Sequence, residues 1–236
     1  MVGPREASFV SVDPTRRLIL WDVDGTLVSN DESDERLFVA ATESVLGPLP
    51  EIVHPYRHGK TDRQQVTEYL EANGGHAGQA DQGSSHLIDH SEVHFAEPGE
   101  RVELPGIQAT LEALAAAGHV NAILTGNSEV RARLKLRSAG LSPDHFNWSA
   151  SFFGDAVGTR VDLTRAASRY AAQHGLAPVV IGDTAADSRA AEGAGIDFIG
   201  VATGVYSAAD LRSTTNILVV DDLEAGARSV LDVLAR

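Results

Sequence analysis

Three absences narrow the classes of protein to which this 236-residue chain can belong. It contains no cysteine, which excludes disulfides, zinc–thiolate sites and cysteine nucleophiles. No apolar run approaches the roughly 20 residues that a membrane-spanning helix needs. Residues 1–13 lack the charged and then apolar pattern of a secretory signal peptide. We therefore expect a cytoplasmic protein without a membrane partner.

Positive charge is also scarce. The chain has 19 Lys and Arg against 33 Asp and Glu, a net charge of −14 at pH 7, and its only lysines are Lys60 and Lys135. Such a negative surface repels nucleic acid, so we expect no nucleic-acid partner, and a phosphate-bearing substrate would need a locally positive site. The length suits one large domain or a domain with an insertion, and we expect a monomer or homodimer.

Short apolar runs alternate with segments of helical spacing. This alternation predicts an α/β fold, a Rossmann-like doubly wound parallel sheet with helices on both faces. The runs expected to form strands are residues 18–21, 120–124, 151–153, 179–181, 198–201 and 217–220. Helices are expected at residues 107–117, 129–139 and 163–174.

A long segment separates the first two expected strands, too long for one crossover helix. Within it, residues 36–46 and 62–72 have helical spacing, whereas the polar, Gly-rich residues 73–85 predict a loop. We therefore predict an α-helical cap domain at residues 31–98. The core would consist of residues 1–30 and 99–236.

The most informative residues end the expected strands. Asp22 and Asp24 follow the first strand, and such close carboxylates repel unless a cation, a shared proton or hydrogen bonds compensate. Because ligands of parallel sheets bind at the carboxyl ends of strands, polar residues there should gather at one edge. Carboxylates suit Mg²⁺, and a hydroxyl with main-chain amides at a helix N-terminus suits phosphate oxygens. The residues ending the second and fourth strands are Thr125, Gly126, Asn127, Asp183 and Asp187.

These motifs, in this order, resemble the haloacid dehalogenase-like superfamily of hydrolases, and in particular its phosphoglycolate phosphatase-like members. The residues that carry the resemblance are the Asp-Val-Asp-Gly-Thr run at residues 22–26, Leu-Thr-Gly-Asn at 124–127 and Gly-Asp-Thr-Ala-Ala-Asp at 182–187. The position of the expected cap matches as well. The resemblance implies a Mg²⁺-dependent phosphatase that hydrolyses a small phosphorylated metabolite through an aspartyl-phosphate.

The resemblance also implies a division of labour within the first motif. Asp22 would be the nucleophile that attacks phosphorus. Asp24 would protonate the leaving alkoxide and then activate water. Because a halide needs no proton to leave, the acid at Asp24 favours phosphoryl transfer over dehalogenation.

The other motif residues would hold the metal and the phosphoryl group. By resemblance, Mg²⁺ would be bound by the carboxylates of Asp22 and Asp183 and by the main-chain carbonyl of Asp24. Asp187 would complete the cluster, either as a ligand or by holding a metal-bound water. The phosphoryl oxygens would be bound by Thr125, Gly126 and Asn127.

The chain departs from the commonest family pattern at the cation that neutralises the nucleophile and the phosphate. Many members carry Lys-Pro before the helix that leads to the fourth strand, whereas this chain has Gly-Thr-Arg at residues 158–160. Two candidates remain, Lys135 and Arg160. We favour Lys135, because lysine acts as a compact point charge for phosphate.

Two features of the expected cap leave their roles open. Lys60 and Arg63 lie on a loop from which they could reach the far end of a substrate, or they could be solvated cations beside a helix cap. His86, His90 and His94 would share one face of a helix and could bind zinc. We favour an exposed polar face for the three histidines.

The motifs leave two other functions open. A sugar phosphomutase resembling β-phosphoglucomutase has the same core motifs and cap placement, and returns the phosphoryl group to a sugar. A non-catalytic phosphate-binding protein would keep the site without the chemistry. Partition of the phosphoryl group between water and sugar hydroxyls separates the first from a phosphatase, and failure to bind Mg²⁺ or a phosphate mimic would favour the second.

Overall fold

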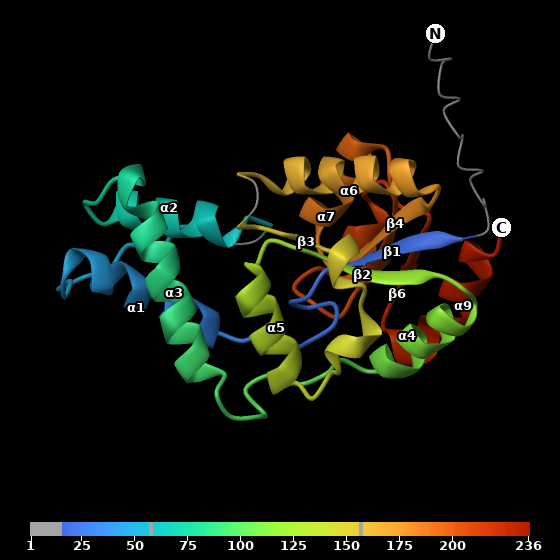
Figure 1. Cartoon of the computed structure of the whole chain (residues 1–236), viewed down its shortest axis with the longest axis horizontal. Helices are drawn as coiled ribbons and strands as arrows, with labels where there is room; N and C mark the ends of the chain where they lie inside the picture. The colour runs from blue at the N-terminus through green and yellow to red at the C-terminus, as the bar shows by residue number, and fades with distance from the viewer. Residues whose placement is uncertain (1–15, 57–58, 156–157) are drawn as a thin grey trace, which may run out of the picture.

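A six-stranded parallel sheet forms the centre of the molecule (Figure 1). The computed structural model describes residues 16–56, 59–155 and 158–236. The strands lie in the order β3-β2-β1-β4-β5-β6, so the winding reverses between β1 and β4. Their bounds are β1 (Arg17–Trp21), β2 (Val120–Thr125), β3 (Phe152–Phe153), β4 (Ala177–Gly182), β5 (Asp197–Val201) and β6 (Leu218–Val220). The predicted doubly wound, Rossmann-like sheet is confirmed.

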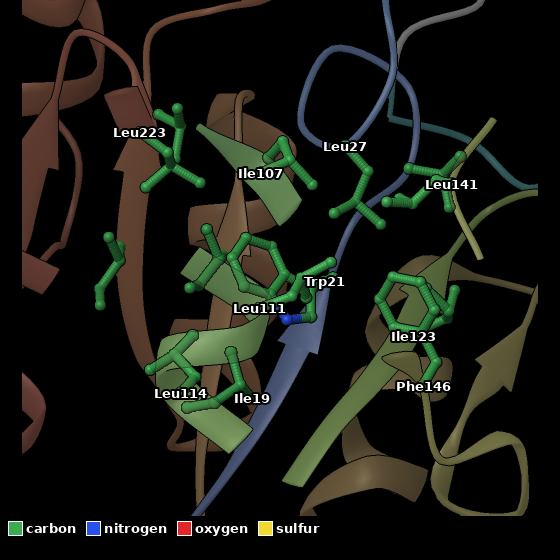
Figure 2. Packing of buried hydrophobic residues seen from close by; sticks show 14 of the residues in the cluster. Ile19, Trp21, Leu27, Ile107, Leu111, Leu114, Ile123, Leu141, Phe146 and Leu223 are labelled. Atoms are coloured by element: carbon green, nitrogen blue, oxygen red, sulfur yellow. The ribbon is translucent and has the colours of Figure 1, made fainter. Parts of the chain in front are cut away.

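Helices cover both faces of this sheet because alternate strand residues point to opposite sides. Ile19 and Trp21 of β1 pack toward one face, where Figure 2 shows them with Leu111 and Leu114. Leu18 belongs to the buried cluster of the other face. The first face is covered by α4 (Ile107–Ala116), α5 (Glu129–Ser138) and α9 (Leu223–Leu234), and the second by α6 (Arg160–His174) and α7 (Ala185–Ala194). The short α8 (Ala208–Arg212) packs beside β5 and β6.

Three helices between β1 and β2 form a separate layer, seen to the left of the sheet in Figure 1. They are α1 (Ser33–Leu46), α2 (Asp62–Ala72) and α3 (Ala80–His94), and all lie within the predicted cap at residues 31–98. Phe38, Tyr69 and Leu87, one from each helix, belong to a hydrophobic cluster of their own. That cluster also contains Leu134 of α5, so the cap rests on this core helix.

The predicted loop at residues 73–85 is wrong for its second half. A 3₁₀ turn, η1 (Ala77–Gln79), leads directly into α3 at Ala80. Gly83, which suggested a loop, lies where α3 crosses α2, and a Cβ there would collide with Val66. Close packing of two helices therefore determines this segment more than its local composition does.

The segment between α5 and β3 contains short turns of helix. Two 3₁₀ turns, η2 (Pro143–His145) and η3 (Trp148–Ala150), lead into β3. No helix in the described ranges has both the length and the apolar character needed to span a bilayer. Residues 1–15 of the predicted core lie outside the described residues.

Candidate active site

The carboxyl ends of β1, β2 and β4 lie side by side, because β1 pairs with both other strands. The amide of Asp22 donates to the carbonyl of Ile181 at 3.0 Å, which continues the β1–β4 pairing to the first carboxylate. The chain then turns at Gly25, whose φ of +78° is left-handed and favours glycine. A Cβ at Gly25 would also collide with the carboxylate of Asp183, so the turn places the first and fourth strand ends in contact.

Three buried carboxylates, those of Asp22, Asp183 and Asp187, gather at this edge. Each offers an oxygen, and these oxygens all lie within 4.8 Å of one another. Burial raises the pKa of Asp22 to about 6 and the pKa of Asp183 well above its ordinary value, and the neighbouring carboxylates add to both shifts. Burial and the neighbouring carboxylates thus disfavour the ionised forms of both side chains, and a bound cation would favour them.

The donor chemistry of this cluster fits a divalent metal. Asp183 Oδ2 and Asp187 Oδ1 are buried and receive no hydrogen bond from the described residues, although Asp187 also forms an ion pair with Arg160. Their other oxygens are held in place. Thr26 Oγ1 donates to Asp183 at 3.1 Å. Thr184 Oγ1 donates to Asp187 Oδ2 at 2.6 Å, and the Thr184 amide donates to the same oxygen at 3.1 Å in the capping box of α7. Hard oxygen ligands of this kind suit Mg²⁺.

Arg160 is the cation beside the expected nucleophile. It is the first residue of α6, and its Nη2 lies 3.0 Å from Asp22 Oδ1 and in ion-pair contact with Asp187. Burial acts to lower the pKa of Arg160, but Asp187 and Asp22 outweigh it and raise that pKa above its ordinary value. The guanidinium therefore stays charged next to Asp22.

Lys135, the cation that the sequence favours beside the nucleophile Asp22, pairs with Asp24 in the structure. Its Nζ donates to Asp24 at 2.7 and 2.8 Å, to Asp34 Oδ2 at 3.0 Å and to Asn127 Oδ1 at 3.0 Å. The two candidate cations thus divide the first motif between them. Lys135 pairs with Asp24, and Arg160 pairs with Asp22, because α5 and α6 approach the site from opposite faces of the sheet.

The residues that follow β2 line the same cavity as these two cations. Thr125 Oγ1 accepts a hydrogen bond from the Asn127 side chain at 2.9 Å, and the same amide nitrogen donates to Asp24 Oδ2 at 2.7 Å. Ser128 then caps α5. With Asp22, Asp24, Asp183 and both cations, Thr125, Gly126 and Asn127 line a cavity of about 480 Å³. The predicted site residues of the core, including Asp187 beside them, are therefore brought together.

The cap covers this cavity and lies close to the β2 loop. The amide of Asp62 donates to the carbonyl of Gly126 at 2.7 Å, and a Cβ at Gly126 would collide with the carbonyl of Lys60. Lys60 lines the cavity, with its ammonium paired to Glu68. Arg63 is half-exposed and paired with Asp81, and it is not among the described residues that line the cavity.

The three histidines of α3 lie apart from the acidic cluster and take separate partners. His90 Nε2 lies 2.9 Å from Ser44 Oγ, and His94 Nε2 lies 3.5 Å from Glu100. His86 lies 3.7 Å from Asp89. Within the described ranges, the group of ligand-type residues with metal-binding spacing is Asp22, Asp183 and Asp187, and it includes none of these histidines.

Sequence reasoning missed a second buried ionic cluster at the junction of cap and core. Asp34 of α1 accepts from Arg101 at 2.7 Å, from Arg131 at 2.7 Å and from Lys135. Burial acts to raise the pKa of Asp34, but these three cations outweigh it and hold that pKa well below its ordinary value. One signal was available: Arg131 and Lys135 lie four residues apart and so share a face of the predicted helix, and Asn127 lies four residues before Arg131, just ahead of that helix.

Comparison with known proteins identifies the family. A model of haloacid dehalogenase-like hydrolases matches residues 16–195. The chain belongs to this family. Membership confirms the resemblance that the strand-end motifs predicted. A sequence comparison with curated proteins finds no match.

Three solved structures share the fold over most of their length. A hydrolase from Pseudomonas syringae is 21% identical, with a TM-score of 0.69 over 92% of this chain and 98% of that one. A predicted phosphoglycolate phosphatase from Haemophilus somnus is 18% identical, with a TM-score of 0.67 over 92% and 98%. CbbY from Rhodobacter sphaeroides, in complex with phosphate, is 20% identical, with a TM-score of 0.64 over 89% and 96%. At these identities the likeness establishes the fold, including a helical cap after β1.

Proposed function

We propose that this haloacid dehalogenase-like hydrolase is a Mg²⁺-dependent phosphatase of a small phosphomonoester. The observation that carries the proposal is the pairing of Asp22 with Arg160 and two further carboxylates on one side of a cavity, while Asp24 stands on the other side with Lys135. A nucleophile beside cations and a separate proton carrier are what two-step phosphoryl transfer requires. The names of the phosphatase and phosphate-bound neighbours agree with it.

In the first step, a carboxylate oxygen of Asp22 attacks phosphorus and the bond from phosphorus to the ester oxygen breaks. Asp24 gives its proton to the departing alkoxide, so the products are an aspartyl-phosphate and a free alcohol. Arg160 stabilises the negative charge shared by Asp22 and the phosphoryl oxygens. Mg²⁺, held by Asp22, Asp183, Asp187 and the main-chain carbonyl of Asp24, would supply further charge neutralisation for the phosphoryl group.

In the second step, Asp24 takes a proton from water, and the water oxygen attacks the phosphoryl group on Asp22. Inorganic phosphate leaves and the Asp22 carboxylate is restored. Asn127 and Lys135 hold the Asp24 side chain in both steps, and Thr125 and the amide of Gly126 bind phosphoryl oxygens. The cap over the cavity limits access of other water molecules and faces the leaving group with Lys60.

The test is phosphate release from a panel of alkyl and sugar phosphomonoesters, with Mg²⁺ and with a chelator. We expect activity with Mg²⁺ only, and loss of it in Asp22→Asn. Asp197→Asn is the matched control, because Asp197 is exposed at the far end of the β5 strand. Full activity of Asp22→Asn, or equal rates with the chelator, would contradict the proposal.

A further inference from the structure

One arginine of the core reaches all three helices of the cap. Arg131 lies on α5, and its guanidinium forms an ion pair with Asp62 of α2 and donates to Asp34 of α1 at 2.7 Å. Its Nε donates to Ser91 Oγ of α3 at 3.0 Å. The same group stacks over the ring of Phe38, 5.2 Å from its centroid. A single core side chain therefore contacts every helix of the cap.

These contacts are largely shielded from water, although the Asp34 carboxylate is 13% exposed. Arg131 and Ser91 are at most 1% exposed. Burial acts to lower the pKa of Arg131, but Asp62 and Asp34 outweigh it and raise that pKa above its ordinary value. A planar guanidinium with five donors can satisfy several partners in fixed directions, which a lysine ammonium cannot do.

The same side chain leads to the proton carrier. Arg131 Nη1 lies 3.4 Å from Asn127 Oδ1, and the Asn127 amide donates to Asp24 Oδ2 at 2.7 Å. A second route runs through Asp34, which binds both Arg131 and Lys135, and Lys135 binds Asp24. Both routes connect the cap to the carboxylate that faces the leaving group.

The cap contacts the N-terminal part of α5 through Asp62. Asp62 binds Arg131 with one oxygen and accepts from the amide of Ser128, the N-cap of α5, with the other at 2.8 Å. If the cap moves away, Arg131 loses Asp34, Asp62 and Ser91 together. Lys135 then loses Asp34, its partner on the cap, and Asn127 remains bonded to an Arg131 that the cap no longer holds.

We propose that Arg131 is a positioning residue that ties docking of the cap to placement of Asp24. Its catalytic consequence rests on the proposed phosphatase function. Its structural consequence does not: replacement of Arg131 should loosen the cap on the core whether or not an ester is hydrolysed. The substitution Arg131→Lys keeps the charge and removes the planar fork. Asp62→Asn removes one cap contact and leaves Arg131 in place.

The distance between cap and core can be measured cleanly, because the chain has no native cysteine. Spin labels at Glu92→Cys on α3 and Arg169→Cys on α6 report that distance in the full chain with Mg²⁺ and orthovanadate. We expect a narrow distribution in the parent and a longer, broader one in Arg131→Lys and Asp62→Asn. The control is Arg137→Gln, an exposed arginine of the same helix. An unchanged distribution in both test variants would overturn the proposal.

The activity test uses leaving groups that differ in their need for a proton. We expect Arg131→Lys to lower kcat about 10- to 100-fold for an alkyl phosphate, because Asp24 is misplaced. For p-nitrophenyl phosphate, whose leaving group needs little protonation, we expect less than about 3-fold. Arg137→Gln should leave both rates unchanged. Equal losses on the two esters, in a variant whose thermal unfolding matches the parent, would show general damage and overturn the positioning role.

The two experiments separate this inference from the function on which it rests. A parent that hydrolyses no ester, while its spin–spin distance still responds to Arg131→Lys, would overturn the phosphatase function and support the docking role. If the parent is active, and Arg131→Lys changes neither the spin–spin distance between cap and core nor the dependence of kcat on the leaving group, the positioning role alone would be overturned.

Discussion

Two buried ionic clusters meet at one cavity and differ in their balance of charge. In the metal-side cluster, the carboxylates of three residues face one guanidinium among the described residues: Asp22, Asp183 and Asp187 with Arg160. In the junction cluster, the carboxylates of Asp24, Asp34 and Asp62 face three cations, Lys135, Arg131 and Arg101, and Arg101 also lies 3.9 Å from the half-exposed Asp31.

This difference reverses the effect of burial on two similar side chains. Asp22 and Asp34 both lose most of their contact with water, yet the pKa of Asp22 is raised to about 6 and the pKa of Asp34 is held well below its ordinary value. The number of neighbouring cations decides the sign. The metal-side cluster is therefore suited to accept a further cation, whereas the carboxylates of the junction cluster are already paired with cations and join cap and core.

The largest expected effect concerns the one cation of the metal-side cluster. Arg160→Gln should lower kcat/KM for a phosphomonoester about 10²- to 10³-fold, because Asp22 and the phosphoryl group lose their fixed positive charge. Arg165→Gln, an exposed arginine on the same helix, is the control. Steady-state kinetics with saturating Mg²⁺ measures the difference. A loss no larger than that of the control would mean that Arg160 only balances charge in the resting site.

The stability of the protein should also depend differently on the same isosteric change in the two clusters. Asp34→Asn should destabilise the protein by about 3–5 kcal/mol, because it leaves buried cations without their partner. Asp183→Asn should cost much less in the metal-free protein, since it removes one of three repelling carboxylates. Urea unfolding in the presence of a chelator gives both values. Similar losses in the two variants would refute the contrast between the clusters.

A smaller effect links Mg²⁺ to pH. Because the folded pKa of Asp22 is raised to about 6, the native metal-free protein holds more protons than the unfolded chain between about pH 4 and pH 6. Stability without metal therefore falls as pH rises through this window. Mg²⁺ needs ionised carboxylates, so the rise in Tm that it causes should be larger at about pH 7.5 than at about pH 5.

The control for this pH dependence is the double variant Asp22→Asn, Asp183→Asn, in which the Mg²⁺-induced rise in Tm should vanish at both pH values. An equal rise in the parent at the two pH values would indicate that Mg²⁺ binds elsewhere.

The smallest effect is expected outside both clusters. Arg63→Gln should change the free energy of unfolding by less than about 1 kcal/mol, because its pair with Asp81 is exposed to solvent. Its kcat/KM should match the parent within about 2-fold, since the side chain does not line the cavity. A larger loss of kcat/KM would show that Arg63 contacts the substrate after all, as its position in the sequence suggested.

The parts of this molecule that local sequence could predict are those whose signal is local. The central strands are short apolar runs because they are buried on both faces, and β1, β2 and β4 end in polar residues because ligands bind there. Asp22, Thr125 and Asp183 could therefore be identified from the residues around them. The helix at residues 80–94 could not be predicted in the same way. In the local sequence Gly83 indicates a loop, whereas in the folded chain it allows α3 to cross close to α2.

The pairing of distant charges leaves no such signal. In the sequence, Lys135 and Arg160 are both candidates for the cation beside Asp22 and residue chemistry favours Lys135. Only the folded chain shows that they approach from opposite faces of the sheet and that Arg160 is the partner of Asp22. Asp34 lies in an acidic run that resembles an ordinary solvated helix start. Its burial follows from the docking of the cap, which its own neighbours in the chain do not specify.

The central claim is that Asp22, within a metal-binding carboxylate cluster, accepts the phosphoryl group. The most direct test is intact mass after acid quench of Asp24→Asn incubated with p-nitrophenyl phosphate. This leaving group needs little protonation, whereas release of phosphate needs the missing base, so the intermediate should accumulate. We predict a Mg²⁺-dependent gain of one phosphoryl group, mapped to Asp22. A phosphoryl group on another residue, or no gain in mass while nitrophenolate is released with Mg²⁺, would contradict the account.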